Sequence, residues 1–223
     1  MKRKCAEQAY ELIKEGMTIG LGAGETIEYL IEFINMGTTD VKIVSPSMKT
    51  ALLCKRHGIQ VIPTWLCDHI DIAFDGCNQI DRSLNCIKTL GALHTQEKMI
   101  GAMADQYIIL ADETKLVEEV DFQVPLAVEI LKDGFSYVLK KLFDMGLRAK
   151  ARITNDKDGY VITDDGNLIV DVDFDSVQDP IETNKAITQI LGVIDTSLFT
   201  DQITQAIIAK KDGTIETITK ETN

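Results

Sequence analysis

Short apolar runs alternate with amphipathic segments along the first half of the chain. Apolar residues recur at helical spacing from Arg3 to Glu15, and Ile27, Leu30, Ile31 and Ile34 share one face of a second helix. The other expected elements are strands at Met17 to Leu21, Val41 to Val44, Ile59 to Ile62, Asp71 to Phe74 and Tyr107 to Leu110, and helices at Met48 to His57 and Thr95 to Ala104. Buried strands that alternate with helices favour an α/β fold: a Rossmann-like, mainly parallel sheet with helices on both faces.

The pattern changes after about Pro125. Strands are expected at Val128 to Ile130, Ala149 to Ile153, Tyr160 to Thr163 and Leu168 to Val172, helices at Tyr137 to Met145 and Pro180 to Ile190, and two strands with a turn at Asp212-Gly213 within Gln205 to Ile218. Such mixing is typical of an α+β domain. We therefore expect a Rossmann-like catalytic domain of residues 1–125 and 201–223, and a small ferredoxin-like α+β domain of residues 126–200 that takes part in oligomerisation.

Charge and composition narrow the possible partners. The chain has 23 Lys and Arg against 35 Asp and Glu, a formal net charge of −12, which disfavours general nucleic-acid binding. No apolar run reaches the roughly 18 residues of a membrane span. The five cysteines are scattered and include no C-x-x-C pair, as in proteins of a reducing compartment. We expect a cytoplasmic protein that binds neither nucleic acid nor membrane.

Chemically useful residues follow the predicted strands of the first domain. Ligands of open parallel sheets bind outside the carboxyl ends of the strands. The segments at those ends are Gly22-Ala23-Gly24-Glu25-Thr26, Ser45-Pro46-Ser47, Asp75-Gly76-Cys77-Asn78 and Asp112-Glu113-Thr114-Lys115. Glycines, hydroxyls, carboxylates and a lysine would therefore meet at one edge of the sheet, as in an enzyme that acts on a small molecule.

Each of these features also has an ordinary structural interpretation. The glycine loop suits an anion at a helix N-terminus, but it equally suits a tight turn. Asp75 could be a turn residue, Lys115 a solvated lysine, and Glu97 part of a solvated helix face. Cys67-Asp68-His69 could hold a metal, but a surface loop is favoured because no second pair of ligands is in view.

Taken together, the segments resemble type A ribose-5-phosphate isomerase, over nearly the whole chain and in the same order. In the first domain the resemblance runs through Gly20-Leu21-Gly22-Ala23-Gly24-Glu25-Thr26, Asp75-Gly76-Cys77-Asn78-Gln79-Ile80, Lys88-Thr89-Leu90-Gly91-Ala92-Leu93-His94-Thr95-Gln96-Glu97-Lys98 and Ala111-Asp112-Glu113-Thr114-Lys115. In the second it runs through Val124-Pro125-Leu126-Ala127-Val128-Glu129, Val161-Ile162-Thr163-Asp164-Asp165-Gly166-Asn167, Asp179-Pro180-Ile181, Gly192-Val193 and Leu198-Phe199.

The resemblance implies an aldose–ketose isomerase of the pentose phosphate pathway. It would interconvert ribose 5-phosphate and ribulose 5-phosphate through an enediol, with no metal and no organic cofactor, as a homodimer or homotetramer. Glu97 matches the family's general base, and Asp75 and Lys88 match groups that handle protons and negative charge on the substrate oxygens. The substrate-binding positions implied in the same way are Gly22, Gly24, Thr26, Ser45, Ser47, Asn78, Gly91, Lys115 and Lys2.

Several motif positions depart from the family pattern. Where the family reads Gly-Thr-Gly-Ser-Thr, Asp-Gly-Ala-Asp-Glu and Lys-Gly-Gly, this chain carries Ala23 and Glu25, Asn78 and Gln79, and Thr89 and Leu90. A carboxylate beside a phosphate is unfavourable unless it points away or pairs with a lysine. An amide cannot take up a proton as a carboxylate does, and side chains after Lys88 would narrow the approach of the backbone to the sugar.

Three functions remain open at this point. The first is ribose-5-phosphate isomerisation, which rests on Asp75, Lys88, Glu97 and Lys115. The second is isomerisation of a different sugar or sugar phosphate, which the altered positions would favour. The third is a non-catalytic relative that binds a sugar phosphate, and it would bind without turnover.

Overall fold

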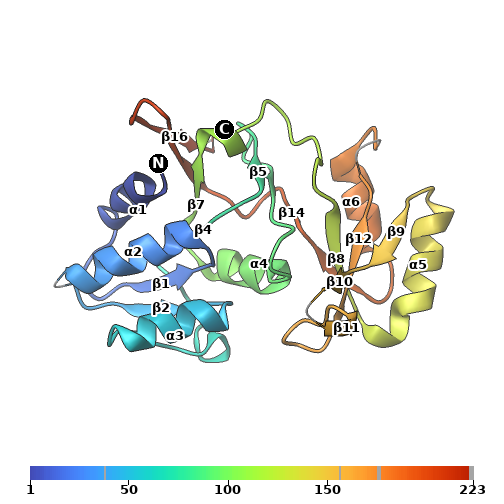
Figure 1. The fold of residues 1–223 in the computed structure, drawn as a ribbon, viewed down its shortest axis with the longest axis horizontal. Coiled ribbons are helices and arrows are strands. Elements are labelled where there is room, and N and C mark those ends of the chain that lie inside the picture. The colour runs from blue at the N-terminus through green and yellow to red at the C-terminus, as the bar shows by residue number, and fades with distance from the viewer. Residues whose placement is uncertain (38, 156, 175–176, 221–223) are drawn as a thin grey trace. The chain divides into compact units, whose positions relative to one another are not determined.

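The computed structural model describes residues 1–37, 39–155, 157–174 and 177–220, which form two compact units (Figure 1). The larger unit consists of Met1–Cys86, Gln96–Val120 and Phe199–Asn223, and the smaller of Ile87–Thr95 and Asp121–Leu198. The chain therefore crosses from one unit to the other four times. Ile87–Thr95, which includes Lys88 and Gly91, belongs to the smaller unit.

One seven-stranded sheet forms the centre of the larger unit, in the order β16-β15-β7-β4-β1-β2-β3. Neighbouring strands are parallel, except that β16 runs antiparallel to β15. The strands are β1 (Thr18–Leu21), β2 (Lys42–Val44), β3 (Gln60–Val61), β4 (Ile72–Asp75), β7 (Tyr107–Asp112), β15 (Gln205–Ala209) and β16 (Ile215–Thr219). The expected mainly parallel sheet is confirmed.

Successive side chains of a strand point to opposite faces of the sheet. Both sets of side chains are buried here, because helices pack on both faces. Ile19, Leu21, Ile72 and Phe74 pack in a cluster with α1 (Lys2–Tyr10), α2 (Glu25–Met36) and α3 (Met48–Arg56). The alternate residues Ala73, Tyr107, Ile109 and Ile208 pack in a second cluster with Ile100 of α4 (His94–Met103). In the part of the chain that is described, no helix has the length and apolar character that crossing a bilayer requires.

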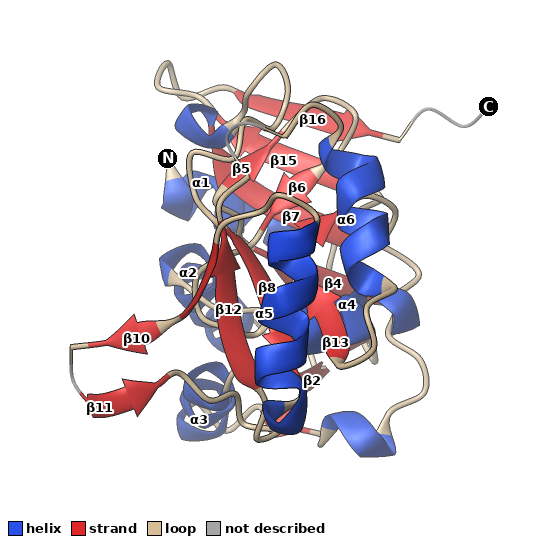
Figure 2. Cartoon of the chain, turned by 90° about the vertical axis from the view of Figure 1, so that its right-hand side faces the viewer, coloured by secondary structure: helices blue, strands red, loops and turns tan. Residues whose placement is uncertain are grey.

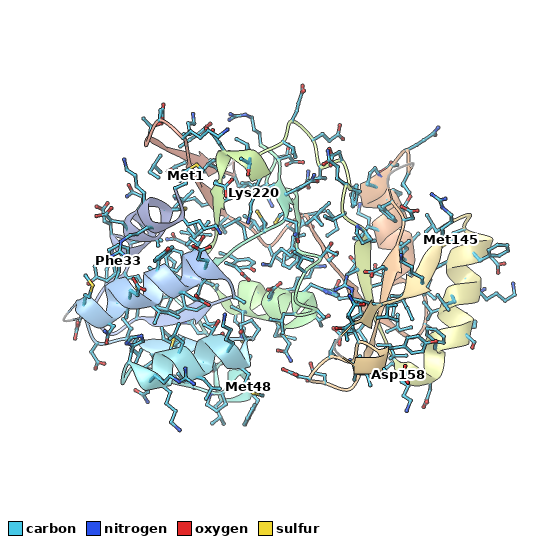
Figure 3. The ribbon with its side chains drawn as sticks, viewed as in Figure 1. Met1, Phe33, Met48, Met145, Asp158 and Lys220 are labelled. Carbon is cyan, nitrogen blue, oxygen red and sulfur yellow. The ribbon has the colours of Figure 1, made fainter. Side chains whose placement is uncertain are left out.

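Helices α1 and α2 pack side by side, and α2 buries the four residues that its sequence pattern places on one face. Phe33 of α2, labelled in Figure 3, stacks on Tyr10 with 6.1 Å between ring centroids. The Arg3 guanidinium lies 5.1 Å from the centroid of the same ring. These contacts join the N-terminal helix to the helix that follows the glycine loop, and so bring Lys2 to that loop.

The smaller unit contains an antiparallel sheet in the order β13-β8-β12-β9, with α5 and α6 over one face (Figure 2). Its elements are β8 (Leu126–Ile130), β9 (Ala149–Ala151), β12 (Leu168–Val172), β13 (Val193–Thr196), α5 (Phe135–Asp144) and α6 (Pro180–Thr188). A hairpin of β10 (Ile153–Thr154) and β11 (Lys157–Tyr160) extends from it. The expected α+β character of this region is confirmed.

Short elements occupy the connections. They are β5 (Gln79–Ile80), β6 (Cys86–Ile87), β14 (Leu198–Phe199) and the 3₁₀ turns η1 (Thr64–Leu66), η2 (Glu113–Lys115) and η3 (Lys132–Gly134). The sequence pattern did not predict β5, β6, β13 or β14.

Many predicted bounds differ from the structure by one or two residues, and three predicted elements differ in a further respect. The first helix ends at Tyr10 rather than Glu15, since the amides of Leu12 and Ile13 bond three residues back in turns. The strand predicted at Ala149 to Ile153 divides at Arg152, whose side chain binds Asp171. The strand predicted at Tyr160 to Thr163 lies earlier, as β11. Each error falls where hydrogen bonds from a distant or turning segment compete with the local pattern.

Close packing of α4 on the sheet depends on glycine. A Cβ atom on Gly20 would lie 2.6 Å from Cγ2 of Ile100 and 2.7 Å from Cβ of Ala73. A Cβ atom on Gly101 would lie 2.7 Å from the ring of Tyr107. These glycines let the helix that carries Glu97 lie directly on β1, β4 and β7.

We expect Gly20→Ala to lower the free energy of unfolding by about 1–3 kcal/mol, the usual cost of overpacking a core. Urea unfolding followed by circular dichroism measures it. Gly134→Ala is the control, because a Cβ atom there meets its nearest neighbour at 3.5 Å, an ordinary contact. Equal stability of Gly20→Ala and the wild type would contradict the close packing of α4.

Candidate active site

The loop after β1 leads into the N-terminus of α2. Gly24 is the N-cap and has φ +111°, a conformation that side-chain-bearing residues rarely adopt. No side chain of the described residues caps this helix end. The first amides of α2, at Glu25 and Thr26, are therefore available at the positive end of the helix dipole, which is an arrangement suited to an anion.

Asp75 ends β4 and is buried, with 2% of its surface exposed. One carboxylate oxygen accepts a hydrogen bond from the amide of Gly76 at 2.7 Å, and the other accepts one from the hydroxyl of Tyr107 at 3.0 Å. A Cβ atom on Gly22 would overlap this carboxylate. Position 22 therefore requires glycine to make room for Asp75, whether or not Gly22 also contacts a ligand.

Tyr107 donates to Asp75, and its hydroxyl is also affected by the charge of Glu97. It is fully buried, and burial raises the pKa of its hydroxyl well above the ordinary value, as do the negative charges of Asp75 and Glu97. Glu97 lies in the first turn of α4 and is 4% exposed. The phenol therefore stays protonated and donates to Asp75. Two carboxylates around one buried phenol are an arrangement suited to proton transfer.

Ser45 and Ser47 lie after β2 at the same edge of the sheet, and their hydroxyls make hydrogen bonds within the loop. Ser47 caps α3 by accepting from the amide of Thr50 at 3.2 Å, and Ser45 accepts from the amide of Ser47 at 3.1 Å. The hydroxyl of Thr50 donates to the carbonyl of Gly22 at 2.9 Å. These bonds hold the loop beside the glycine loop.

Two charged residues meet at the start of α2. The ammonium of Lys2 forms an ion pair with the carboxylate of Glu25, and the hydroxyl of Tyr29 donates to the same carboxylate at 3.3 Å. The hydrogen bond between Lys2 and Glu25 raises the pKa of Lys2 and lowers the pKa of Glu25. The structure thus pairs the unexpected acid with a lysine.

Asp112 and Lys115 follow β7. Asp112 begins η2 by accepting from the amide of Thr114 at 3.0 Å. Burial raises the pKa of Asp112, but the bonds from Thr114 and the charges of Lys115 and Lys2 outweigh it, and the net pKa lies below the ordinary value. The charges of Lys2 and Lys115 therefore both act on Asp112, and Lys2 also pairs with Glu25 at the start of α2.

The remaining altered motif in this unit is at Asn78 and Gln79. Asn78 is half-buried in the turn after β4, and Gln79 is buried in β5. Asn78 therefore lies close in the chain to Asp75, at the end of the same strand.

Lys88 and Gly91 lie in the smaller unit, in a segment fixed by several hydrogen bonds. Lys88 is 5% exposed, and its amide donates to the carbonyl of Ser197 at 3.0 Å. The Thr89 hydroxyl donates to the carbonyl of Pro125 at 2.6 Å. Arg152 donates to the carbonyl of Thr89 at 2.9 Å. Thr89 therefore anchors this segment.

The segment beyond Thr89 borders a cavity of about 690 Å³, which Leu90, Gly91, Ala92 and Arg152 help to line. Gly91 has φ +91° and Ala92 has φ +56°, so the chain turns sharply here. The Leu90 side chain is 72% exposed. It therefore points into solvent within this unit and does not fill the core.

Glu129 is a buried carboxylate that accepts three hydrogen bonds in the smaller unit. The donors are the hydroxyl of Thr95 at 2.5 Å, the hydroxyl of Thr163 at 2.9 Å and the side-chain amide of Asn167 at 2.8 Å. Thr95 lies in the first turn of α4, two residues before Glu97. The network therefore fixes the side chain of Thr95 within the smaller unit.

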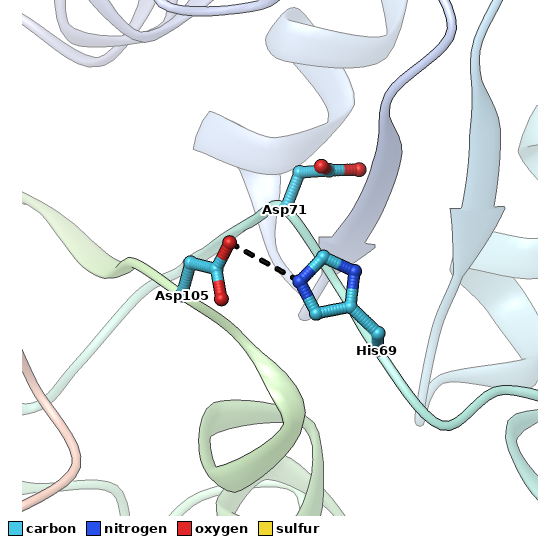
Figure 4. Close-up of side chains that lie close together, drawn as sticks. All are labelled: His69, Asp71 and Asp105. Atoms are coloured by element: carbon cyan, nitrogen blue, oxygen red, sulfur yellow. Dashed lines mark ion pairs between the residues drawn. The ribbon is translucent and has the colours of Figure 1, made fainter.

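A third group of ionisable residues lies at the opposite edge of the parallel sheet. His69, Asp71 and Asp105 precede β4 and β7 and bring their ligand atoms within 4.8 Å of one another (Figure 4). His69 pairs with Asp105 at 3.1 Å, and Asp71 accepts from the amide of Thr18 at 2.8 Å. These residues are far along the strands from Asp75 and Asp112, so they take no part in the candidate active site.

The sequence pattern missed Tyr107, Arg152 and the role of Glu129. Tyr107 begins an apolar strand, and the sequence pattern does not mark it as a site residue because only its hydroxyl is polar. Arg152 lies within a predicted strand, and its partner Asp171 is close only in the folded sheet, through the register of β9 and β12.

The chain is similar to one family throughout. The family model for ribose 5-phosphate isomerase A (phosphoriboisomerase A) matches residues 42–213. Ribose-5-phosphate isomerase A of a Synechococcus strain is 36% identical over 96% of this chain and 94% of its own length. The enzyme of the same name from Pyrococcus abyssi is 35% identical over 96% of this chain and 95% of its own length.

Solved structures agree with the sequence relatives. Ribose 5-phosphate isomerase A from Methanocaldococcus jannaschii has a TM-score of 0.90 and 34% identity, and the match covers 98% of each chain. A D-ribose-5-phosphate isomerase in complex with phospho-erythronic acid has a TM-score of 0.90 and 32% identity, with 98% of this chain and 97% of that chain covered. The likeness therefore extends over both units.

We expect Glu129→Leu to lower the free energy of unfolding by about 2–4 kcal/mol, because three buried donors lose their acceptor. Glu129→Gln should cost much less, since its amide oxygen still accepts from Thr163 and Asn167 and its nitrogen can donate to Thr95. Urea unfolding measures both, with exposed Glu182→Leu as the control. Equal losses for the Leu and Gln variants would contradict the network.

Proposed function

The chain belongs to the ribose 5-phosphate isomerase A family and is an isomerase of ribose 5-phosphate, and we propose that Glu97, Asp75 and Lys88 are its catalytic residues. The observation that carries the proposal is the buried cluster of Asp75, Tyr107 and Glu97 at the carboxyl edge of the parallel sheet. Its two carboxylates can hold and move the protons that an aldose–ketose isomerisation requires.

The proposed reaction moves one proton between neighbouring carbons of the open-chain sugar. Glu97 removes the proton from C2, the electrons of that bond form a C1=C2 double bond, and O1 takes up a proton to give the enediol. Glu97 then returns its proton to C1 while O2 loses its proton and becomes the ketone oxygen. A positioned base of this kind supplies about 10²–10⁴ in rate.

Asp75 is proposed to exchange protons with the substrate hydroxyls. Tyr107 is proposed as its positioning residue: the raised pKa keeps the phenol neutral, so that it donates to one oxygen of Asp75 throughout. The Gly76 amide holds the other oxygen. Both bonds hold the Asp75 carboxylate in a fixed orientation.

Lys88 is proposed to stabilise the negative charge that develops on the substrate oxygens. Its burial favours this role, because a charge acts more strongly where water is excluded. The bonds around Thr89 hold its backbone in place without glycine. Gly91 is proposed to bind the sugar through its backbone, since an exposed Leu90 leaves that backbone uncovered.

The phosphate is proposed to bind at the start of α2. Gly24 and Thr26 would supply amides and a hydroxyl, and Lys2 and Lys115 positive charge. Gly22, whose amide donates to the carbonyl of Phe74 at 2.9 Å, would line the site without a side chain. Ser45 and Ser47 are proposed to contact the substrate at the rim, beside their bonds within the loop, and Asn78 to bind a sugar hydroxyl. No metal and no organic cofactor is needed for these steps.

We also propose that the protein is cytoplasmic and forms a homodimer or homotetramer through the smaller domain, residues 126–200. Large apolar side chains on its surface support this, among them Phe143 at 77% exposed, Leu191 at 83% and Ile153 at 69%. Residues 1–125 and 201–223 would then form the catalytic domain.

We expect Glu97→Gln to lower kcat for ribose 5-phosphate by about 10²–10⁴-fold, because the amide cannot accept the C2 proton. The assay is the conversion of ribose 5-phosphate to ribulose 5-phosphate by purified protein, with exposed Glu118→Gln as the control. Competitive inhibition by inorganic phosphate should persist in a sensitive assay of the variant. Retention of full turnover in Glu97→Gln would rule out Glu97 as the base.

We expect Asn78→Asp to raise kcat by up to about tenfold, because it restores an acid at a position where the family has one and a second proton-handling group would then stand near Asp75. The same assay measures it, with Asn35→Asp as a control on α2. A fall in kcat would show instead that the site is tuned to the amide.

A further inference from the structure

The proposed phosphate site already contains an anion of its own. Glu25 occupies the first turn of α2, where the helix dipole favours negative charge, and its carboxylate forms an ion pair with Lys2. Among the residues that the structure describes, the hydroxyl of Tyr29 also donates a hydrogen bond to this carboxylate, at 3.3 Å. The side chains of Lys2 and Glu25 are 43% and 53% exposed. Glu25 thus fills part of the place that a phosphate oxygen would take.

The charges around this place balance before any substrate arrives. Lys2 and Lys115 provide two positive charges, and Glu25 and Asp112 provide two negative charges that act on them. An arriving phosphate dianion therefore meets a site with little net positive charge, and it must compete with a carboxylate for Lys2.

We propose that Glu25 is a built-in competitor of the substrate phosphate, which releases Lys2 when the phosphate binds and so sets the affinity of the site for phosphorylated substrate. The inference rests on the proposed function. The dianion carries more charge than the carboxylate it displaces and can use the helix amides as well. Glu25 can turn away because its side chain is half exposed and its ion pair with Lys2 lies at the surface.

A different role for the same pair would give an effect of the opposite sign. If Glu25 held Lys2 in place for the phosphate, removal of the carboxylate would weaken substrate binding. If Glu25 competes with the phosphate, its removal strengthens binding. The sign of the change in KM therefore separates the two roles.

The experiment compares wild type and Glu25→Gln in steady-state isomerisation of ribose 5-phosphate. We expect KM to fall about three- to tenfold with kcat within about twofold, and the inhibition constant of inorganic phosphate to fall in parallel. The difference in KM should shrink at high salt, because salt screens exposed charges. A purely structural effect of the substitution would not follow ionic strength in this way.

Glu28→Gln is the matched control. Glu28 lies in the same first turn of α2 and pairs with Lys49 at 2.7 Å, so the variant changes the helix charge equally but leaves Lys2 paired. Its KM should stay near that of the wild type. An unchanged or higher KM in Glu25→Gln, with an active wild type, would overturn the inference and leave the function intact. Absence of turnover in folded wild type would overturn the proposed function itself.

Discussion

The contact between Gly22 and Asp75 is the constraint on which the candidate site depends. A side chain at position 22 would overlap the Asp75 carboxylate, so the absence of one lets a charged group lie inside the larger unit at the end of β4. Burial of an unpaired carboxylate is costly, and here the Gly76 amide and the Tyr107 hydroxyl offset that cost. The negative charge of Glu97 also raises the pKa of Tyr107, so the phenol that Asp75 accepts from stays protonated.

The two ends of the proposed site differ in their exposure to solvent. Asp75 and Glu97 are buried, and hydrogen bonds and charges act more strongly there than in water, which favours proton transfer. Around Lys2 and Glu25 the groups are exposed, so their ion pair is weak and exchangeable. A buried end for the chemistry and an exposed end for the phosphate suit a substrate whose charged group stays apart from the reacting carbons.

In the smaller unit, hydrogen bonds fix the backbone of the segment that contains Lys88. Thr89 and Arg152 hold the segment of Lys88, and Glu129 holds Thr95 at the start of α4. Side chains at Thr89 and Leu90, where the family has glycine, are therefore compatible with an ordered segment: one makes hydrogen bonds and the other points into solvent. The altered motif is thus supported by its surroundings.

Hydrophobic periodicity and the order of the motifs determined the fold class, the four buried positions of α2 and the meeting of the strand-end segments at one edge, because these depend on local spacing and on parallel pairing. The bounds of short strands such as β13, the split at Arg152 and the early end of α1 depend on hydrogen bonds to distant or turning segments, and only the tertiary structure decided them. The same is true of the site. The sequence alone predicted Asp75, Glu97 and Lys2 as site residues. Their partners Tyr107 and Glu25 depend on the pairing of β4 with β7 and the packing of α1 on α2. Side chains far apart in the chain meet only when those elements pack.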